Sequence, residues 1–270
     1  RLVLETLASQ AAISLENARL YRELYDAKNT MERRVEERTA QLEDANTELN
    51  AFSHSVSHDL RAPLRAMKGL SSILLEDYSE GIDAEGRLLI GRIIHGSDKM
   101  TELVDGLLAL SHIQHTVLDI TSVSLSQLVK ESNAELSECF PNQACSFVCA
   151  DDINVKGDRR MLKSLVENLL NNAWKYTAKV DSPRIEFGVD VQSERNVYFI
   201  RDNGAGFNME YVDKIFVAFQ RLHSESEFSG TGIGLATVKR IVNKHEGEIW
   251  VDAKVGEGAI FHFTLGPLPG

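Results

Sequence analysis

The stretch "SLVENLLNNAWKYT", residues 164–177, decides what kind of domain forms the second half of this chain. Its apolar residues recur at helical spacing: Leu165, Leu169, Leu170 and Ala173. That spacing predicts an amphipathic helix. Asn168 and Asn172 stand four residues apart and therefore share one face of it. Their amide oxygens could hold a hard cation such as Mg²⁺, or be satisfied by buried neighbours.

The segments after this helix alternate between strand and helix patterns. Residues 184–192 ("RIEFGVDVQ") and 196–204 ("NVYFIRDNG") alternate apolar and polar residues like strands. Residues 232–247 read as a helix that ends at Gly247. Residues 248–265 read as a closing hairpin with its turn near Gly256–Gly258. This order predicts an α+β sandwich, with one sheet and helices on one face.

Two glycine-containing stretches flank the predicted strands and helices. "DNGAGF" (202–207) follows a strand, so Asp202 points an acceptor to the strand end and the glycines allow close approach of a ligand. "GTGIGLATVKR" (230–240) runs into a helix N-terminus, where free N–H groups suit phosphate. It is neither a Walker A loop nor a Rossmann fingerprint. Each stretch alone is also compatible with an ordinary turn, but the combination with the Asn pair favours a nucleotide site.

The first sixty residues contain neither Pro nor Gly and predict a long helix. From Leu24 to Val56 the core positions step alternately by four and three residues, and this 3.5-residue period indicates a left-handed coiled coil. Lys28 and Arg38 are polar defects in that seam. The alternative is an amphipathic helix that packs on its own domain.

A second helix follows a break at "SEGID" (79–83), with Asp83 as its predicted N-cap. Its apolar positions from Leu89 to Leu110 again step by four and three. Two long helices joined by a short loop form an antiparallel hairpin whose two apolar seams cannot cover each other. We therefore expect a dimeric, antiparallel four-helix bundle.

The stretch "SHSVSHDLRAPLR" (53–65) places two histidines on the first helix of this hairpin. His58 is followed by Asp59, and a neighbouring carboxylate can orient an imidazole and make it a better nucleophile. His54 has no such neighbour. Pro63 removes the helical hydrogen bond to the carbonyl of residue 59, so we expect a kink there.

Composition excludes several functional classes. The chain has 270 residues and a net charge of -11, which suggests one to three domains and disfavours nucleic acid as a partner. Three cysteines without a CxxC pair indicate thiols in a reducing compartment. No run of 18 apolar residues and no signal peptide appears, so we expect a cytoplasmic segment without membrane contact. The chain opens at Arg1 within a helical pattern, which suggests a fragment of a larger sensor protein whose membrane attachment elsewhere stays open.

From about residue 51 to 265 the chain resembles a sensor histidine kinase of two-component signalling. "SHDLRAPLR" looks like the H box of that family and "ENLLNNAWKYT" like its N box. "DNGAGF" looks like the first glycine box, "IFVAFQRLH" like the F box and "GTGIGLATV" like the second glycine box. The region from the F box onward resembles the phytochrome-like branch. The opening "LASQAAISLENARLY" is similar to the last helix of a GAF sensor domain.

The resemblance implies a reaction and its partners. His58 would be phosphorylated with ATP, Asp59 would accept a hydrogen bond from its ring, and the phosphoryl group would pass to an aspartate in the receiver domain of a response regulator. Ala62 stands where many relatives carry Thr or Asn to orient a hydrolytic water, so weak phosphatase activity is expected. A hinge near residues 114–120 would let the ATP-binding domain reach the histidine.

The resemblance also assigns nucleotide contacts within an ATP-binding domain of the GHKL (Bergerat) type. Asn168 and Asn172 would hold Mg²⁺ against the triphosphate. The further contacts fall into three groups: Lys175 and Arg221 to phosphate; Tyr176 and Asp202 to adenine; and Gly204, Gly206, Gly230, Thr231, Gly232, Gly234 and Leu235 along the pocket and its lid.

Three domains follow from this interpretation: a signal-transmitting coiled-coil helix over residues 1–50, a dimerisation and phosphotransfer hairpin over 51–117, and a catalytic domain over 118–270. Two alternatives remain open at this point. Another ATPase of the same superfamily would carry a water-activating glutamate in place of Asn168, and an inert dimerisation scaffold would lack asparagines or glycines of the motifs.

Overall fold

The structure is a computed structural model that describes residues 2–141, 143–192, 195–222, 227–228 and 230–266. Within helices and strands, side chains are described except at 2–13, 18, 42–43, 46–47, 49–54, 58, 114–115, 191–192 and 195. The chain divides into two compact units, residues 1–55 and 56–270.

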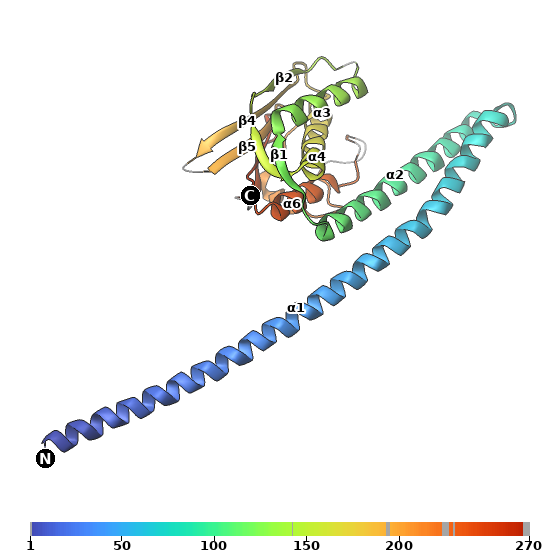
Figure 1. The fold of residues 1–270 in the computed structure, drawn as a ribbon. Coiled ribbons are helices and arrows are strands. Elements are labelled where there is room, and N and C mark those ends of the chain that lie inside the picture. Colours follow the sequence, from blue (N-terminus) through green and yellow to red (C-terminus); the bar gives the residue numbers. More distant parts are fainter. Residues whose placement is uncertain (1, 142, 193–194, 223–226, 229, 267–270) are drawn as a thin grey trace. The chain divides into compact units, whose positions relative to one another are not determined.

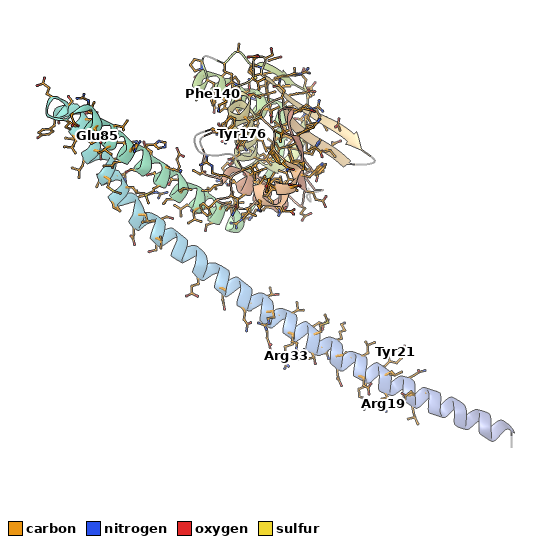
Figure 2. The ribbon with its side chains drawn as sticks, turned by 180° about the vertical axis from the view of Figure 1, so that it is seen from behind. Arg19, Tyr21, Arg33, Glu85, Phe140 and Tyr176 are labelled. Atoms are coloured by element: carbon orange, nitrogen blue, oxygen red, sulfur yellow. The ribbon has the colours of Figure 1, made fainter. Side chains whose placement is uncertain are left out.

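The first unit is the N-terminal part of helix α1 (Leu2–Asp77). Acidic and basic side chains pair along its surface at a spacing of four residues, as between Arg19 and Glu23 at 2.9 Å (Figure 2). The predicted seam residues Leu24 and Met31 are 66% and 69% exposed in the single chain. A helix with an uncovered apolar seam matches the expected coiled coil, because such a seam is buried only by a second helix.

The second unit begins with the predicted hairpin. Helix α1 continues through Pro63 to Asp77, and the short 3₁₀ helix η1 (Ser79–Gly81) leads to α2 (Ala84–His115). The Asp83 carboxylate accepts the N–H of Gly86 at 2.7 Å, which confirms the predicted N-cap. Two ion pairs connect the helices of the hairpin: Arg61 with Asp105 and Lys68 with Asp98, each with a nitrogen–oxygen distance of 2.6 Å.

The remaining elements build a sandwich of helices on a sheet (Figure 1). Their bounds, in chain order, are β1 (Ile120–Ser124), α3 (Leu125–Cys139), β2 (Ser146–Cys149), β3 (Asn154–Asp158), α4 (Arg159–Thr177), β4 (Arg184–Gln192), β5 (Arg195–Asp202), η2 (Met209–Tyr211), α5 (Val212–Ile215), α6 (Gly234–Lys244), β6 (Ile249–Lys254) and β7 (Gly258–Phe263).

The main sheet has five strands in the order β2-β4-β5-β7-β6. Only β2 and β4 run parallel, and the register sets Asp202 of β5 opposite Ala259 of β7. One apolar core joins the sheet to α3, α4 and α6, and its fully buried members include Leu165, Leu169 and Phe187. This confirms the α+β sandwich predicted from residues 164–265.

Two predictions about the sheet and its helices need correction. The expected single sheet is incomplete, because β1 and β3 pair in a separate two-stranded sheet. Helix α6 ends at Lys244 and not at Gly247. Glu246 takes the left-handed conformation, with φ of 55°, and the N–H of Gly247 returns to the carbonyl of Val242 at 3.0 Å. This is the Schellman ending, with a glutamate at the position where glycine is usual.

Candidate functional site

A cavity of about 420 Å³ lies at the end of α4. Figure 2 labels two residues of its wall: Tyr176 on α4 and Phe140, which follows α3. Twelve of the residues predicted to contact ATP line it together: Asn168, Asn172, Lys175, Tyr176, Asp202, Gly206, Arg221, Gly230, Thr231, Gly232, Gly234 and Leu235. The fold therefore gathers one helix face and two loops, far apart in sequence, around one space.

Helix α4 presents its polar face to the cavity because its apolar face is held in the core. Leu165 and Leu169 are buried, while Asn168 and Asn172 lie at the cavity wall. The Nδ2 of Asn168 donates to the Ser164 carbonyl at 2.7 Å, and its Oδ1 faces Gly234. This orientation leaves an amide oxygen, which is a ligand atom that Mg²⁺ accepts, on the cavity side.

Lys175 and Arg221, the predicted phosphate contacts, bring positive charge to the cavity, whose wall also includes Lys99. Burial, together with the nearby charge of Arg221, lowers the pKa of Lys175 to about 8. The Lys175 ammonium lies 4.2 Å from the centroid of the Tyr176 ring. Arg221 donates to the Phe228 carbonyl at 2.6 Å and so ties the loop after the F box. Two cations near one cavity suit an anionic ligand such as a triphosphate.

Asp202 also lines the cavity. Its side chain is 5% exposed, and burial raises the pKa of this carboxyl to about 6 despite N–H donation from Gly204 and Ala259. The Gly204 N–H lies 2.8 Å from Oδ1. A buried carboxylate with a remaining acceptor position is suited to an amino group of a base.

The glycine positions have different physical reasons. Gly206 and Gly232 have φ values of 57° and 75°, and a Cβ at either would meet a backbone atom at 2.0 Å and 2.7 Å. Gly204 is not among the residues that line the cavity, and its role toward a nucleotide stays a prediction. A Cβ there would lie 2.6 Å from the Tyr176 carbonyl oxygen, and the glycine therefore allows the loop to pack against the end of α4.

Several cavity residues were not predicted. Ala259 and Phe261, within the segment predicted as the closing hairpin, form part of the wall together with Asp202. Helix α2 of the hairpin also contributes, through His95, Asp98, Lys99 and Glu102. Ala259 reaches the cavity because it pairs with Asp202 across β5 and β7, and that pairing has no local signal in the sequence. No local pattern marks the four α2 residues, because their place at the cavity depends on how the hairpin packs against the rest of the unit.

The predicted phospho-acceptor lies on α1. Its side chain is outside the described residues, so the structure gives only its place in the helix: His58, one residue after the buried Ser57. Asp59 is exposed and does not line the cavity. None of the helices in the described part of the chain combines the length and the hydropathy that a membrane span needs.

The cavity residues fit ATP with Mg²⁺. The observations that support this fit are the Asn168 oxygen turned to the cavity, the two cations, the buried Asp202 and glycines whose Cβ atoms would clash. Asn168 and Asn172 would hold the metal ion, and Lys175 and Arg221 would face the phosphates. No glutamate stands at the position of Asn168, which disfavours the alternative of a water-activating ATPase.

Comparison with known families agrees with this geometry. The family described as "His Kinase A (phospho-acceptor) domain" matches residues 48–116. The family described as "Histidine kinase-, DNA gyrase B-, and HSP90-like ATPase" matches residues 157–268. Together the two matches span about two thirds of the chain.

Curated relatives point in the same direction. Cyanobacterial phytochrome B of Nostoc sp. is 36% identical over 83% of this chain and 30% of its own length. Phytochrome-like protein Cph1 of Synechocystis sp. is 31% identical, with the same two coverages. Sensor histidine kinase WalK of Bacillus subtilis is 29% identical over 83% of this chain and 37% of its own. The chain thus spans about a third of the length of these relatives.

Solved structures share the fold. Full-length ShkA in complex with AMPPNP has a TM-score of 0.60 at 22% identity and covers 79% of this chain and 45% of that one. Acinetobacter baumannii histidine kinase AdeS has a TM-score of 0.55 at 21% identity, over 77% and 97%. With a phospho-acceptor hairpin, a nucleotide-sized cavity and both family matches in place, this chain belongs to the sensor histidine kinases and combines their phospho-acceptor and ATPase domains.

Proposed function

We propose that this chain transfers the γ-phosphoryl group of ATP to His58 and then to an aspartate in the receiver domain of a response regulator. The observation that carries the proposal is the cavity in which Asn168, Asn172, Lys175 and Asp202 meet. The match of residues 48–116 to a phospho-acceptor domain supports His58 as the group that receives the phosphoryl group from ATP. The ShkA structure, whose complex contains AMPPNP, supports a nucleotide as the ligand.

The chain's own residues perform most of the work in this mechanism. A nitrogen of the His58 ring attacks the γ-phosphorus in line, the bond from phosphorus to the bridging oxygen breaks, and ADP leaves with that oxygen. The Asp59 carboxylate orients the ring and accepts its N–H. Lys175 and Arg221 stabilise the charge that spreads over the phosphoryl oxygens. When bound at Asn168 and Asn172, Mg²⁺ would supply neutralisation of the triphosphate.

Dimerisation belongs to the same proposal. On the hairpin, large apolar side chains are exposed in the single chain: Leu60, Met67, Leu70, Ile73, Leu74, Leu88, Leu89, Ile93 and Met100. A homodimer that pairs two hairpins as a four-helix bundle would bury them. Residues 1–50 would then form a two-stranded coiled coil that brings a signal from a preceding GAF-like sensor domain.

A second reaction to consider is hydrolysis of the phosphoryl group from the phosphorylated response regulator. Ala62 is exposed on α1, one turn after His58, and its methyl group cannot orient a water for hydrolysis of a phosphorylated partner. We therefore infer weak phosphatase activity.

Incubation with ATP labelled at the γ-phosphate tests the proposed function. Wild type should acquire label that is lost in acid and kept in alkali, as expected of a phosphorus–nitrogen bond. Asn172→Ala should bind nucleotide poorly and remain unlabelled, and His58→Gln should bind nucleotide normally without acquiring label. Acid-stable label, or equal labelling of His58→Gln, would contradict the proposal.

A further inference from the structure

Asp158 joins two segments that are distant in the chain. It is the last residue of β3 and the N-cap of α4, and its side chain is 1% exposed. Oδ1 accepts the N–H groups of Arg160 and Met161 at 2.9 and 3.2 Å, and Oδ2 accepts the N–H of Asp119 at 3.2 Å. Since Asp119 lies in the short connection between α2 and β1, one buried carboxylate holds both the exit of the hairpin and the first turn of α4.

His245 attaches the end of α6 to the same point. Its side chain is fully buried, and its Nε2 accepts the backbone N–H of Asp158 at 3.1 Å. Its Nδ1 lies 2.8 Å from the Ile241 carbonyl oxygen and therefore carries the proton that it donates. A Cβ at Gly157 would approach the ring to 3.1 Å, so the ring is packed without spare room. The imidazole is therefore neutral, with its proton on Nδ1, and it connects the end of α6 to the start of α4 through its two hydrogen bonds.

The two helices held at this point both contribute residues to the wall of the nucleotide cavity. Asn168 and Asn172 lie on α4, and Gly234 is the first residue of α6. Asn168 stands nine residues after Arg159, or roughly 14 Å along the helix axis. Neither Asp158 nor His245 lines the cavity. Any effect that they have on a nucleotide must therefore pass through the placement of the two helices.

We propose that Asp158 and His245 form a positioning pair, which fixes α4 relative to α6 and ties the spacing across the nucleotide cavity to the segment that leaves the hairpin. This inference rests on the proposed function. A helix cap alone would need only the two N–H groups of α4. The bonds to Asp119 and His245 exceed that need, and they link the three segments that must move together when the ATP-binding domain approaches the phospho-acceptor.

Two substitutions separate the hydrogen bonds of the ring. His245→Gln keeps an acceptor near the Nε2 position but loses the donor to Ile241, whose carbonyl still accepts the backbone N–H of residue 245. His245→Asn keeps a donor near the Nδ1 position but leaves the buried N–H of Asp158 without a partner. The two variants therefore differ in whether the hydrogen bond between residue 245 and the Asp158 N–H, which links α6 to α4, is kept.

The first test is titration of wild type, the two variants and the control His262→Gln with Mg–ATP, after thermal unfolding has shown that each is folded. His262 packs against Trp250 on β6 and takes no part in the cavity. We expect His245→Gln and the control to stay near the wild-type Kd, and His245→Asn to bind about tenfold more weakly. Equal Kd values for His245→Gln and His245→Asn would overturn the positioning pair. Absence of binding by wild type would instead contradict the proposed function.

A measurement on wild type keeps the inference testable if a variant does not fold. Hydrogen exchange at the amides of Asp158 and Asp119 should slow by about fivefold or more when Mg–ATP binds, because the ligand favours the helix spacing that these bonds hold. The amide of Ser146, bonded to the Pro183 carbonyl at 2.8 Å, serves as the control and should not change. Unchanged exchange at both Asp158 and Asp119 would overturn the inference.

Discussion

Gly234 and Asn168 lie so close together in the wall of the cavity that a Cβ at residue 234 would lie 2.6 Å from the Asn168 Oδ1. No real side chain fits at that distance unless the amide moves. Since this oxygen is the atom proposed to hold Mg²⁺, the glycine is required by the metal ligand as much as by the phosphates.

Gly234→Ala should therefore weaken binding of Mg–ATP by roughly tenfold or more, as is usual when a metal ligand loses its orientation. Binding of ATP without the metal ion should weaken much less. Gly91→Ala on α2 is the matched control, because a Cβ there meets nothing within 4 Å. Calorimetric titration with and without Mg²⁺ gives the comparison, and equal loss in both conditions would argue against a metal role for Asn168.

Nucleotide affinity should depend on pH with a maximum between the pKa values of Asp202 and Lys175, about 6 and about 8. Below pH 6 the Asp202 carboxyl takes up a proton and accepts the adenine amino group less well. Above pH 8 Lys175 loses the charge that attracts phosphate. Each limb should fall by at most about tenfold per pH unit.

Variants show which residue causes the fall in nucleotide affinity on the acid side of the pH profile and which causes the fall on the alkaline side. Asp202→Asn should remove the acid limb, and Lys175→Met the alkaline limb, each from a lower starting affinity. An affinity that continues to rise above pH 8 in wild type would contradict the role given to Lys175.

The contact between the hairpin and α6 depends on Gly106. A Cβ there would lie 2.5 Å from Cδ1 of Ile233, and Arg240 donates to the Leu110 carbonyl at 2.6 Å in the same contact. Gly106→Ala should leave α2 helical but open this contact, because overpacking of this kind costs about 1–3 kcal/mol. Hydrogen exchange at the amide of Thr237, in the first turn of α6, should accelerate in Gly106→Ala. Gly96→Ala on the same helix meets no atom within 4 Å and should match wild type. Identical exchange in all three proteins would show that the contact does not form in solution.

Ala62→Thr should increase dephosphorylation of the phosphorylated receiver domain, because the hydroxyl can orient a water that the alanine methyl cannot. The gain should be about tenfold or more, in the range of a positioned general catalyst. Autophosphorylation with ATP should change little. Rapid dephosphorylation by wild type would refute the assignment of weak phosphatase activity.

The sequence predicted the elements whose signals are local. The apolar spacing around Leu165 and the alternation in residues 184–192 predicted α4 and β4, and the side chain of Asp83 predicted the start of α2. These features depend on the period of one helix or strand, or on one cap, and so can be read from a short window.

What could not be predicted depends on contacts between distant segments. Gly204 follows a strand like a ligand-binding glycine, but its position is set by the carbonyl of Tyr176. The small sheet of β1 and β3 joins residues 30 or more positions apart. The ring of His245 meets Asp158 across 87 residues. Nothing in a local window carries such pairings.

The central claim is that His58, and not the histidine one turn before it, receives the phosphoryl group. Mass spectrometry of the peptide around residues 54 and 58, recovered under alkaline conditions after incubation with Mg–ATP, measures this directly. We expect fragments that carry phosphate on His58 and none on His54, with no phosphorylated peptide from Asn172→Ala. Phosphate on His54, or on a serine of the same peptide, would contradict it.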